Sequence, residues 1–491
     1  MKNLTVSILV ILFGYNFAFT QITETKLVPS GAQRGDRTGH SVAIWDNYLV
    51  IGAPNSGDFT GCAYVYEKTD GVWIEKTRLT ASDSYTSQYF GWQVAIYDDV
   101  ILIGAYGDDD NGTNAGAAYI FRRDPQTGTW DQQVKLLPAD GDAYDKFGYS
   151  VSLWGNYALI GAPLYNGDIG SVYLFKRTGN TWIQEAKLIA ENGVGEALFG
   201  CAVSVQENYA VIGAHYDEEK GHDAGAAYIF HFDGLQWVQQ AKIFSSDINK
   251  ADSFGMSVSI SGETVVVGAS PKANAYIFRR KENTWTEEAI LTKDYYTQFG
   301  CSVSIEGGFV VIGAYYDDTF GSASGCGYIY RYENNIWTEE AKLLASDGNE
   351  GDWMGWSVSL KDDQVLVGAS RQYAGGINSG AVYLYENFVT GMIDSRSSKV
   401  KDCFLEQNYP NPFYRNTFIG YHLPVSGYVT LKVFDILGRE VSTLVNEHKP
   451  AGSYEVEFRP ETGSRELPTG KYFYRLKTVD HTSVKEMLLL K

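Results

Sequence analysis

The sequence predicts an all-β protein with a seven-bladed β-propeller, closed by its N-terminal strand, followed by a small C-terminal β-sandwich. Three observations lead to this prediction. A glycine pattern recurs seven times, the chain contains 52 Gly, 35 Tyr and 11 Trp, and every tryptophan lies between Trp45 and Trp356. A chain of 491 residues is too long for one compact core, so the repeats and the Trp-free remainder are expected to fold separately.

Two glycines define the repeat. The first usually follows phenylalanine, and the second begins a Gly-Ala pair 13 residues later in all seven units. Because this interval is constant, the variation in length between units falls in the connecting loops. The first glycines are Gly39, Gly91, Gly148, Gly200, Gly255, Gly300 and Gly355, and the second are Gly52, Gly104, Gly161, Gly213, Gly268, Gly313 and Gly368.

Each unit predicts four strands, as the third unit illustrates. Residues 149–153 alternate in polarity and residues 158–162 are apolar, which is typical of a first strand with one buried face and of an apolar second strand. Residues 173–175 read Tyr-x-Phe, and residues 182–188 run from Trp to Lys-Leu. Four-stranded units with a period of about 50 residues describe propeller blades. Gly and Ala allow close approach near the axis, while the aromatic residues fill the wedge farther out.

The N-terminal strand is expected to close the ring. The seventh unit ends after Tyr385 without a tryptophan strand, and residues 23–28 resemble the fourth strand of the sixth unit at 338–343. Pairing of this segment with the seventh unit would remove the open sheet edges. Residues 22–386 are therefore predicted to form one propeller.

The chain begins like an exported protein. Lys2 precedes an apolar run at 4–13 and small residues near 18–20, so residues 1–20 are predicted to be a signal peptide. No later stretch has 18 consecutive apolar residues, so the mature chain is predicted to lack a transmembrane helix. The five cysteines have no spacing typical of a disulfide framework or a zinc site.

The net charge of −19 excludes one class of partner. An acidic surface has no cations to replace those condensed on a phosphate backbone, so no nucleic-acid partner is predicted.

The repeat resembles a known family. Residues 147–148 and 161–163 read Phe-Gly and Gly-Ala-Pro, which resembles the FG-GAP repeat of the integrin alpha-chain propeller, and residues 104–112 are similar to its bacterial secreted branch. The resemblance implies a ligand-binding or scaffold propeller and names no ligand.

The family's calcium site does not carry over to this chain. In integrin-type repeats a calcium loop lies in the hairpin before Gly-Ala-Pro, and here the constant interval leaves room only for a short turn. Acidic clusters occur after the Gly-Ala pair instead, where they could hold Ca²⁺ through oxygen ligands or form solvated turns. No cofactor is predicted, and calcium is the alternative. Its candidate ligands are Asp108, Asp110, Asp217 and Asp317.

Two other motifs have the residue types of a binding site. His215, Asp217, His222 and Asp223 lie in one loop and could ligate a transition metal, although two histidines in a blade loop are more often surface decoration. Residues 34–36 spell Arg-Gly-Asp, but the last repeat has Glu-Gly-Asp at the aligned place, which favours a blade-connecting turn.

No catalytic residues are predicted. The seven histidines are dispersed, neither G-x-S-x-G nor HExxH occurs, and most carboxylates recur from blade to blade. Aromatic residues in the loops could stack on sugars, grip a protein or fill space between blades. They include Tyr89, Trp92, Tyr106, Tyr315, Tyr316, Trp353 and Trp356.

The C-terminal part follows a different pattern. Residues 387–403 are predicted to be a linker, and residues 404–491 show alternating strands separated by Pro/Gly turns. This run resembles the type A C-terminal sorting domain of the type IX secretion system, which implies translocation across the outer membrane. The residues that carry the sorting motif are Pro410, Asn411, Pro412, Phe413, Gly438, Arg439, Gly470, Tyr472 and Lys491.

These observations predict an exported, non-catalytic binding or scaffold module of an adhesion type. It is expected to be secreted or held at the outer-membrane surface, reached through the periplasm after signal-peptide cleavage. The expected partners are the type IX machinery and an unidentified surface protein or glycan. The alternative is a carbohydrate-binding protein or a glycan-degrading enzyme on a propeller scaffold.

Overall fold

The computed structural model describes residues 22–388 and 404–490, apart from a few short segments. The chain divides into two compact units, one covering Gln21–Phe388 and one that includes Val389–Lys491. The predicted signal peptide and most of the predicted linker lie outside the described residues. No helix in the described ranges is long and apolar enough to cross a membrane. The segments not described within these ranges are 192–195, 375, 406–407, 409–410, 412, 415, 424–426, 451, 463–464 and 479–481.

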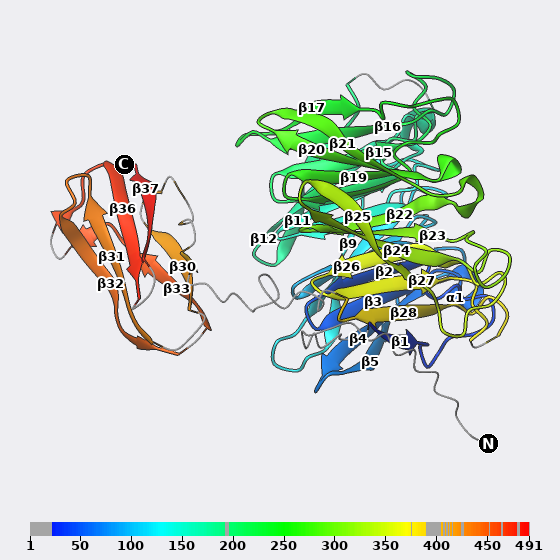
Figure 1. Ribbon diagram of the computed structural model, residues 1–491, viewed down its shortest axis with the longest axis horizontal. Coiled ribbons are helices and arrows are strands. Elements are labelled where there is room, and N and C mark those ends of the chain that lie inside the picture. The colour runs from blue at the N-terminus through cyan, green and yellow to red at the C-terminus, as the bar shows by residue number, and fades with distance from the viewer. Residues whose placement is uncertain are drawn as a thin grey trace, which may run out of the picture. The chain divides into compact units, whose positions relative to one another are not determined.

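The first unit is a ring of seven four-stranded antiparallel sheets, which confirms the predicted propeller (Figure 1). Blade 1 contains β2 (Ser41–Trp45), β3 (Tyr48–Ala53), β4 (Cys62–Thr69) and β5 (Val72–Leu79). Blade 2 contains β6 (Val94–Tyr97), β7 (Val100–Ala105), β8 (Ala117–Arg123) and β9 (Trp130–Leu136). Blade 3 contains β10 (Ser150–Trp154), β11 (Tyr157–Ala162), β12 (Ser171–Thr178) and β13 (Thr181–Leu188). Blades 4 and 5 contain β14 (Ala202–Gln206), β15 (Tyr209–Ala214), β16 (Ala226–Phe232) and β17 (Trp237–Ile243); and β18 (Ser257–Ser261), β19 (Thr264–Ala269), β20 (Asn274–Lys281) and β21 (Thr284–Thr292). Blades 6 and 7 contain β22 (Phe299–Glu306), β23 (Phe309–Ala314), β24 (Cys326–Glu333) and β25 (Ile336–Leu343); and β26 (Met354–Lys361), β27 (Gln364–Ala369), β28 (Ala381–Glu386) and β1 (Thr23–Leu27). The loops add the short turns α1 (Ser56–Phe59), α2 (Tyr165–Asp168), η1 (Ser270–Lys272) and η2 (Tyr295–Thr297).

The N-terminal strand closes the ring, as predicted. β1 pairs antiparallel with β28, with Glu24 opposite Tyr385 and Lys26 opposite Tyr383. On the inner side, the Ser357 hydroxyl of blade 7 donates a hydrogen bond of 2.8 Å to the carbonyl of Gly39 in blade 1. The two ends of the propeller segment are therefore joined at both the outer and the inner edge of the seventh blade.

The core lies between neighbouring blades. Phenylalanines of the Phe-Gly pairs are buried and meet the tyrosines of the third strands edge-on, as in Phe90–Tyr119 and Phe147–Tyr173, with ring centroids 5.3 Å and 5.4 Å apart. Such pairs stabilise the fold by about 0.5–1.5 kcal/mol beyond the area that they bury. Cys62 and Cys326 are fully buried in this core, where they pack as small apolar residues.

The second unit is a small β-sandwich, as predicted. One sheet contains β29 (Phe404–Leu405), β30 (Thr417–Leu423) and β33 (Gly452–Phe458), and the other contains β32 (Glu440–Lys449), β31 (Gly427–Asp435), β36 (Gly470–Lys477) and β37 (Thr482–Leu489). A short hairpin contains β34 (Glu461–Thr462) and β35 (Arg465–Glu466). Apolar side chains from both sheets form one core.

Candidate functional site

The carboxylates predicted as calcium ligands lie in three separate blades and do not converge. Asp217 is fully buried at the start of the β15–β16 loop. Its Oδ2 accepts a hydrogen bond of 2.7 Å from the Tyr228 hydroxyl and lies 2.8 Å from the Lys242 ammonium. Burial, followed by the charge of Asp217, raises the pKa of Tyr228 above its usual value. The same arrangement recurs in Asp108–Tyr119–Lys135 and in Asp317–Tyr328–Lys342.

A lysine ammonium therefore occupies the place that a cation would take at these carboxylates. Asp110, half exposed, lies 2.6 Å from the same Lys135 that pairs with Asp108. Calcium requires six to eight oxygen ligands at about 2.3–2.6 Å, so an ion would have to displace the lysine. Calcium binding stays a prediction, and this arrangement weighs against it.

Sequence reasoning missed these lysines, although their signal was present in the repeated Lys-Leu ending of the fourth strand. Three further blades build the same triad with an aspartate from the preceding connection. These triads are Asp140–Tyr173–Lys187, Asp247–Tyr276–Lys272 and Asp347–Tyr383–Lys26. A device that recurs in six blades serves the fold rather than a single site.

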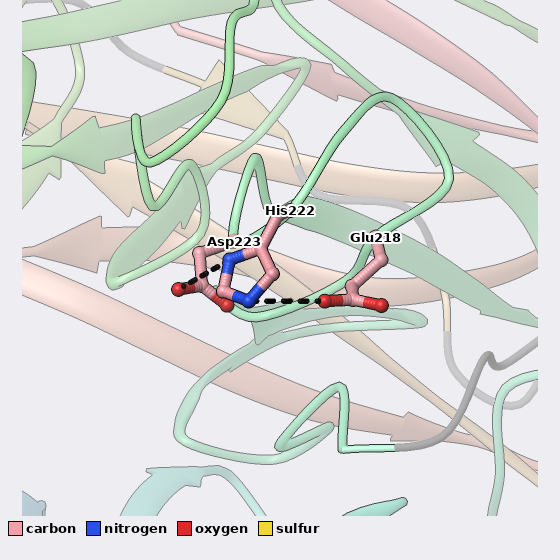
Figure 2. Close-up of side chains that lie close together, drawn as sticks. All are labelled: Glu218, His222 and Asp223. Atoms are coloured by element: carbon pink, nitrogen blue, oxygen red, sulfur yellow. Dashed lines mark ion pairs between the residues drawn. The ribbon is translucent and has the colours of Figure 1, made fainter.

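The histidine loop brings together only part of the predicted group. Figure 2 shows His222 between two carboxylates, with Nδ1 3.0 Å from Asp223 and Nε2 3.7 Å from Glu218. His215 is half-buried and lies against the Tyr216 ring, outside this group, and Asp217 is held by its lysine. The close group could hold a divalent ion through one nitrogen and two carboxylates, and a protonated His222 would form ion pairs there without one.

The Arg-Gly-Asp segment is a structural turn. Asp36 is only 4% exposed, and its Oδ2 accepts a hydrogen bond of 2.8 Å from the backbone N–H of Gln33. Asp352 does the same with Asn349 before blade 7. The aspartate is therefore not presented for recognition, which agrees with its interpretation as a blade-connecting turn.

The connection into every blade ends in the same turn, which we call the axial turn. The residue two positions before the first repeat glycine has a left-handed backbone, with φ between 53° and 57°. Its carbonyl accepts a hydrogen bond from the N–H of the residue that follows the glycine. Each axial turn therefore presents two side chains where the innermost strand begins. In blade order these pairs are Arg37/His40, Tyr89/Trp92, Lys146/Tyr149, Leu198/Cys201, Ser253/Met256, Gln298/Cys301 and Trp353/Trp356.

Aromatic and cationic side chains gather on four consecutive axial turns, those of blades 7, 1, 2 and 3, which we call the axial arc. The Trp353 and Trp356 rings are nearly parallel, at 16°, with centroids 5.3 Å apart. Trp356 lies 5.7 Å from His40, which lies 4.2 Å from Trp92, and Trp92 lies 5.6 Å from Tyr149. The four tryptophan and tyrosine rings of these contacts are half-buried, so one continuous aromatic surface crosses four blades. Tyr89, Tyr106, Tyr315 and Tyr316 extend it.

His40 is a neutral, buried member of the arc. Its Nδ1 lies 2.9 Å from the Trp92 carbonyl, so Nδ1–H donates and Nε2 carries the lone pair. Burial, together with the charge of Arg37, lowers the pKa of His40 to about 4. Nε2 is buried and has no hydrogen-bond partner within the part of the chain that the structure describes.

The predicted sorting-motif residues fall into two groups in the sandwich. Asn411 Oδ1 accepts a hydrogen bond of 2.8 Å from the Leu488 N–H, and buried Phe413 pairs through its backbone with Leu488 and Leu490. Arg439 bonds Asp435 at 2.7 Å across the turn that holds Gly438. Pro410, Pro412 and Lys491 lie outside the described residues. A hollow of about 410 Å³ is lined by residues that include Asp435, Ile436, Leu437, Arg439, Gly470 and Tyr472.

Comparisons with known proteins decide the family. FG-GAP repeats match the chain over residues 22–66, 73–121, 130–175, 182–230, 237–278, 285–330 and 337–385. The chain belongs to the FG-GAP repeat family. A secretion system C-terminal sorting domain matches residues 407–490, so both predicted resemblances are confirmed.

Two individual proteins are similar to this FG-GAP chain. Integrin alpha-M of Mus musculus is 25% identical over 291 residues, which is 51% of this chain and 24% of that protein. The chain therefore spans about a quarter of the length of this relative. Among solved structures, Saccharomyces cerevisiae Sqt1 matches with 10% identity and a TM-score of 0.42, over 78% of this chain and 92% of that chain.

Within this FG-GAP propeller, the axial turns are where the repeat loses its symmetry. The repeat glycines and the buried aromatic residues recur from blade to blade, whereas the two axial positions differ among the blades. Sequence reasoning selected seven loop aromatics but missed Arg37, His40, Lys146 and Tyr149. Aligning the repeats on the first glycine, and comparing the positions two before and one after it, would have found them.

Proposed function

We propose that this protein is an exported, non-catalytic binding module that acts at the cell surface or in the medium, in the manner of an adhesin. The observation that carries the proposal is the axial arc, an aromatic surface fixed on a closed ring and centred on four of its seven blades. A rigid surface with half-buried aromatic rings is suited to contact a ligand, because little side-chain freedom is lost on binding. The buried aspartates of the triads are each neutralised by a lysine and accept a hydrogen bond from a tyrosine, which suits a structural role rather than proton transfer.

The sorting domain supports the export half of the proposal. It indicates secretion or surface localisation, and its motif favours the type IX system as the machinery. The route would cross the inner membrane with removal of residues 1–20, followed by the periplasm and the outer membrane.

Deletion of residues 404–491 is expected to abolish export across the outer membrane and leave the chain in the periplasm. The propeller should survive, because it is a separate compact unit with its own closed ring of blades. Immunoblots of medium, surface and periplasmic fractions measure the outcome. As a control, a fluorescent protein carrying residues 1–20 and 404–491 should leave the cell. Release of the truncated chain into the medium would contradict the proposal.

If the protein is a non-catalytic binding module, it is expected to bind a ligand and not to convert it into products. Arrays of glycans and of surface proteins, probed with the full chain, are expected to show saturable binding. A parallel assay for hydrolysis and lyase products on every bound polysaccharide should show none. Turnover of a polysaccharide would establish the glycan-degrading alternative in place of the non-catalytic module.

A further inference from the structure

The axial arc carries unpaired positive charge on an acidic protein. Neither position of any axial turn is Asp or Glu, although the chain contains 59 of these residues and has a net charge of −19. Among the described residues, Arg37 and Lys146 of the arc form no ion pair. Arg371 lies near Arg37, with its guanidinium 3.3 Å above the Trp353 ring and a buried Nε that has no hydrogen-bond partner among the described residues. Burial, and then the charge of Arg37, lowers the pKa of Arg371, so the two cations are close enough to repel.

The nearest aspartates do not neutralise these cations. Asp36, Asp145 and Asp352 each directly precede an axial turn, but all three are buried. Each accepts a hydrogen bond of 2.8 Å from the backbone three residues earlier. Burial raises the pKa of all three carboxyl groups. The positive charge of the arc is therefore available to a ligand.

The rings of the arc provide flat apolar faces beside these cations. Lys146 lies 5.4 Å from the centre of the Tyr106 ring, and Tyr106 stacks on Tyr89 at 4.9 Å with an angle of 11°. A pyranose ring has a face of C–H groups that packs on such rings and a rim of hydroxyl groups that donate hydrogen bonds. His40 Nε2 is a buried acceptor that has no donor among the described residues, and a hydroxyl that reaches it can donate a hydrogen bond, whereas a carboxylate cannot.

The arc combines aromatic faces, unpaired cations and an acceptor for a hydroxyl group. A ligand that matches all three carries flat apolar faces, negative charges and hydroxyl groups. We propose that the axial arc binds an anionic saccharide, with its sugar rings stacked on the aromatic side chains and its carboxylate or sulfate groups paired with Arg37, Lys146 and Arg371. This inference rests on the proposed binding function and names its ligand class. An acidic peptide would satisfy the cations but would leave the flat faces without a matching partner.

The test measures binding of the full chain to four defined probes by calorimetry. Oligogalacturonate supplies carboxylates, a sulfated galactan oligomer supplies sulfates, methyl-esterified oligogalacturonate keeps the sugar chain but removes the charge, and polyglutamate keeps the charge without sugar. One or both anionic saccharides are expected to bind, with affinity that falls as salt rises. The ester is expected to bind at least about tenfold more weakly, and polyglutamate should not bind.

Paired variants locate the site. R37Q/K146Q is expected to weaken binding of the anionic saccharide by about tenfold and to abolish most of its salt dependence. Trp92→Leu should weaken binding of the acid and of the ester alike, by about tenfold, because it removes a stacking face and no charge. The matched control, Gln298→Ala, changes the same turn position in blade 6 and should leave affinity unchanged. Melting curves of R37Q/K146Q and Gln298→Ala should match the parent, while Trp92→Leu should keep one cooperative transition at a lower midpoint because it loses ring contacts.

Three results would overturn the proposal. The ester could bind as well as the acid, polyglutamate could bind more tightly than either saccharide, or the variants could leave the affinity unaltered. Binding of a neutral glycan or a protein on the arrays, without binding of these probes, would overturn the ligand class and leave the binding module intact. Failure of every ligand would overturn both.

Discussion

Replacement of Lys242 by methionine is expected to lower the free energy of unfolding of the propeller by about 3–5 kcal/mol. The Asp217 side chain is fully buried, and the Lys242 side chain, 10% exposed, lies 2.8 Å from it. Methionine keeps most of the lysine's length but leaves the carboxylate with Tyr228 and no cation. Urea unfolding followed by tryptophan fluorescence reports on the propeller alone, because all 11 Trp lie between Trp45 and Trp356.

A lysine of the same loop region is the matched control. Lys220 is 44% exposed and pairs at 3.3 Å with Glu219, whose side chain is 41% exposed. Because exposed pairs contribute little, Lys220→Met should change the free energy of unfolding by less than about 1 kcal/mol. Equal losses in the two variants would show that the buried pair has no special role.

The same variant tests calcium. In the parent chain neither Ca²⁺ nor EDTA should move the melting midpoint, since ammonium groups already neutralise Asp108, Asp217 and Asp317. A ligand that binds only the folded state raises the midpoint. Recovery of the K242M midpoint in millimolar Ca²⁺ would show that Asp217 can accept the ion once the lysine is gone. A shift in the parent chain would mean that calcium displaces the lysines.

The fold could be predicted from the sequence because seven copies of one pattern restrict the possible folds far more than the local propensities of the residues do. The constant interval between Gly148 and Gly161, repeated in every unit, defined an inner hairpin before any contact was known. The closing strand could be predicted because Lys26-Leu27 repeats the ending of the fourth strands, and the structure pairs it with β28. Repetition thus supplied long-range information that a single blade lacks.

The candidate site was predicted less well than the fold, because the type of a residue does not reveal which side chain it contacts. Asp217 was selected as a cation ligand, and its cation is an ammonium 25 residues downstream on β17, which only the register of β16 and β17 brings beside it. Most aromatic members of the arc were predicted only as separate loop residues, and Tyr149 was missed. Their union with Arg37 and His40 depends on a left-handed turn at each blade, and no propensity of arginine or tyrosine predicts that conformation.

Replacement of Gly313 by alanine is expected to destabilise the propeller by about 3 kcal/mol or more, because two backbones meet at this position. A Cβ atom there would lie 1.9 Å from the Gly355 carbonyl oxygen of the next blade and 3.3 Å from the Cys301 sulfur. A side chain could rotate away, but a carbonyl fixed between two closed blades cannot. The blades would have to separate along the inner ring, which also opens the interblade core. The midpoint of urea unfolding measures the loss.

Gly308 provides the control within the same blade. It is the second residue of the two-residue turn into β23, its backbone lies outside the left-handed region, and a Cβ there would meet no atom closer than 3.6 Å. Gly308→Ala should therefore be neutral or stabilise the chain by up to about 1 kcal/mol, since alanine restricts the unfolded state. If both substitutions prove harmless, the ring can expand by the width of a methyl group. The repeat glycines would then mark a preference of each separate blade, not the close contact between blades that sets the radius of the ring.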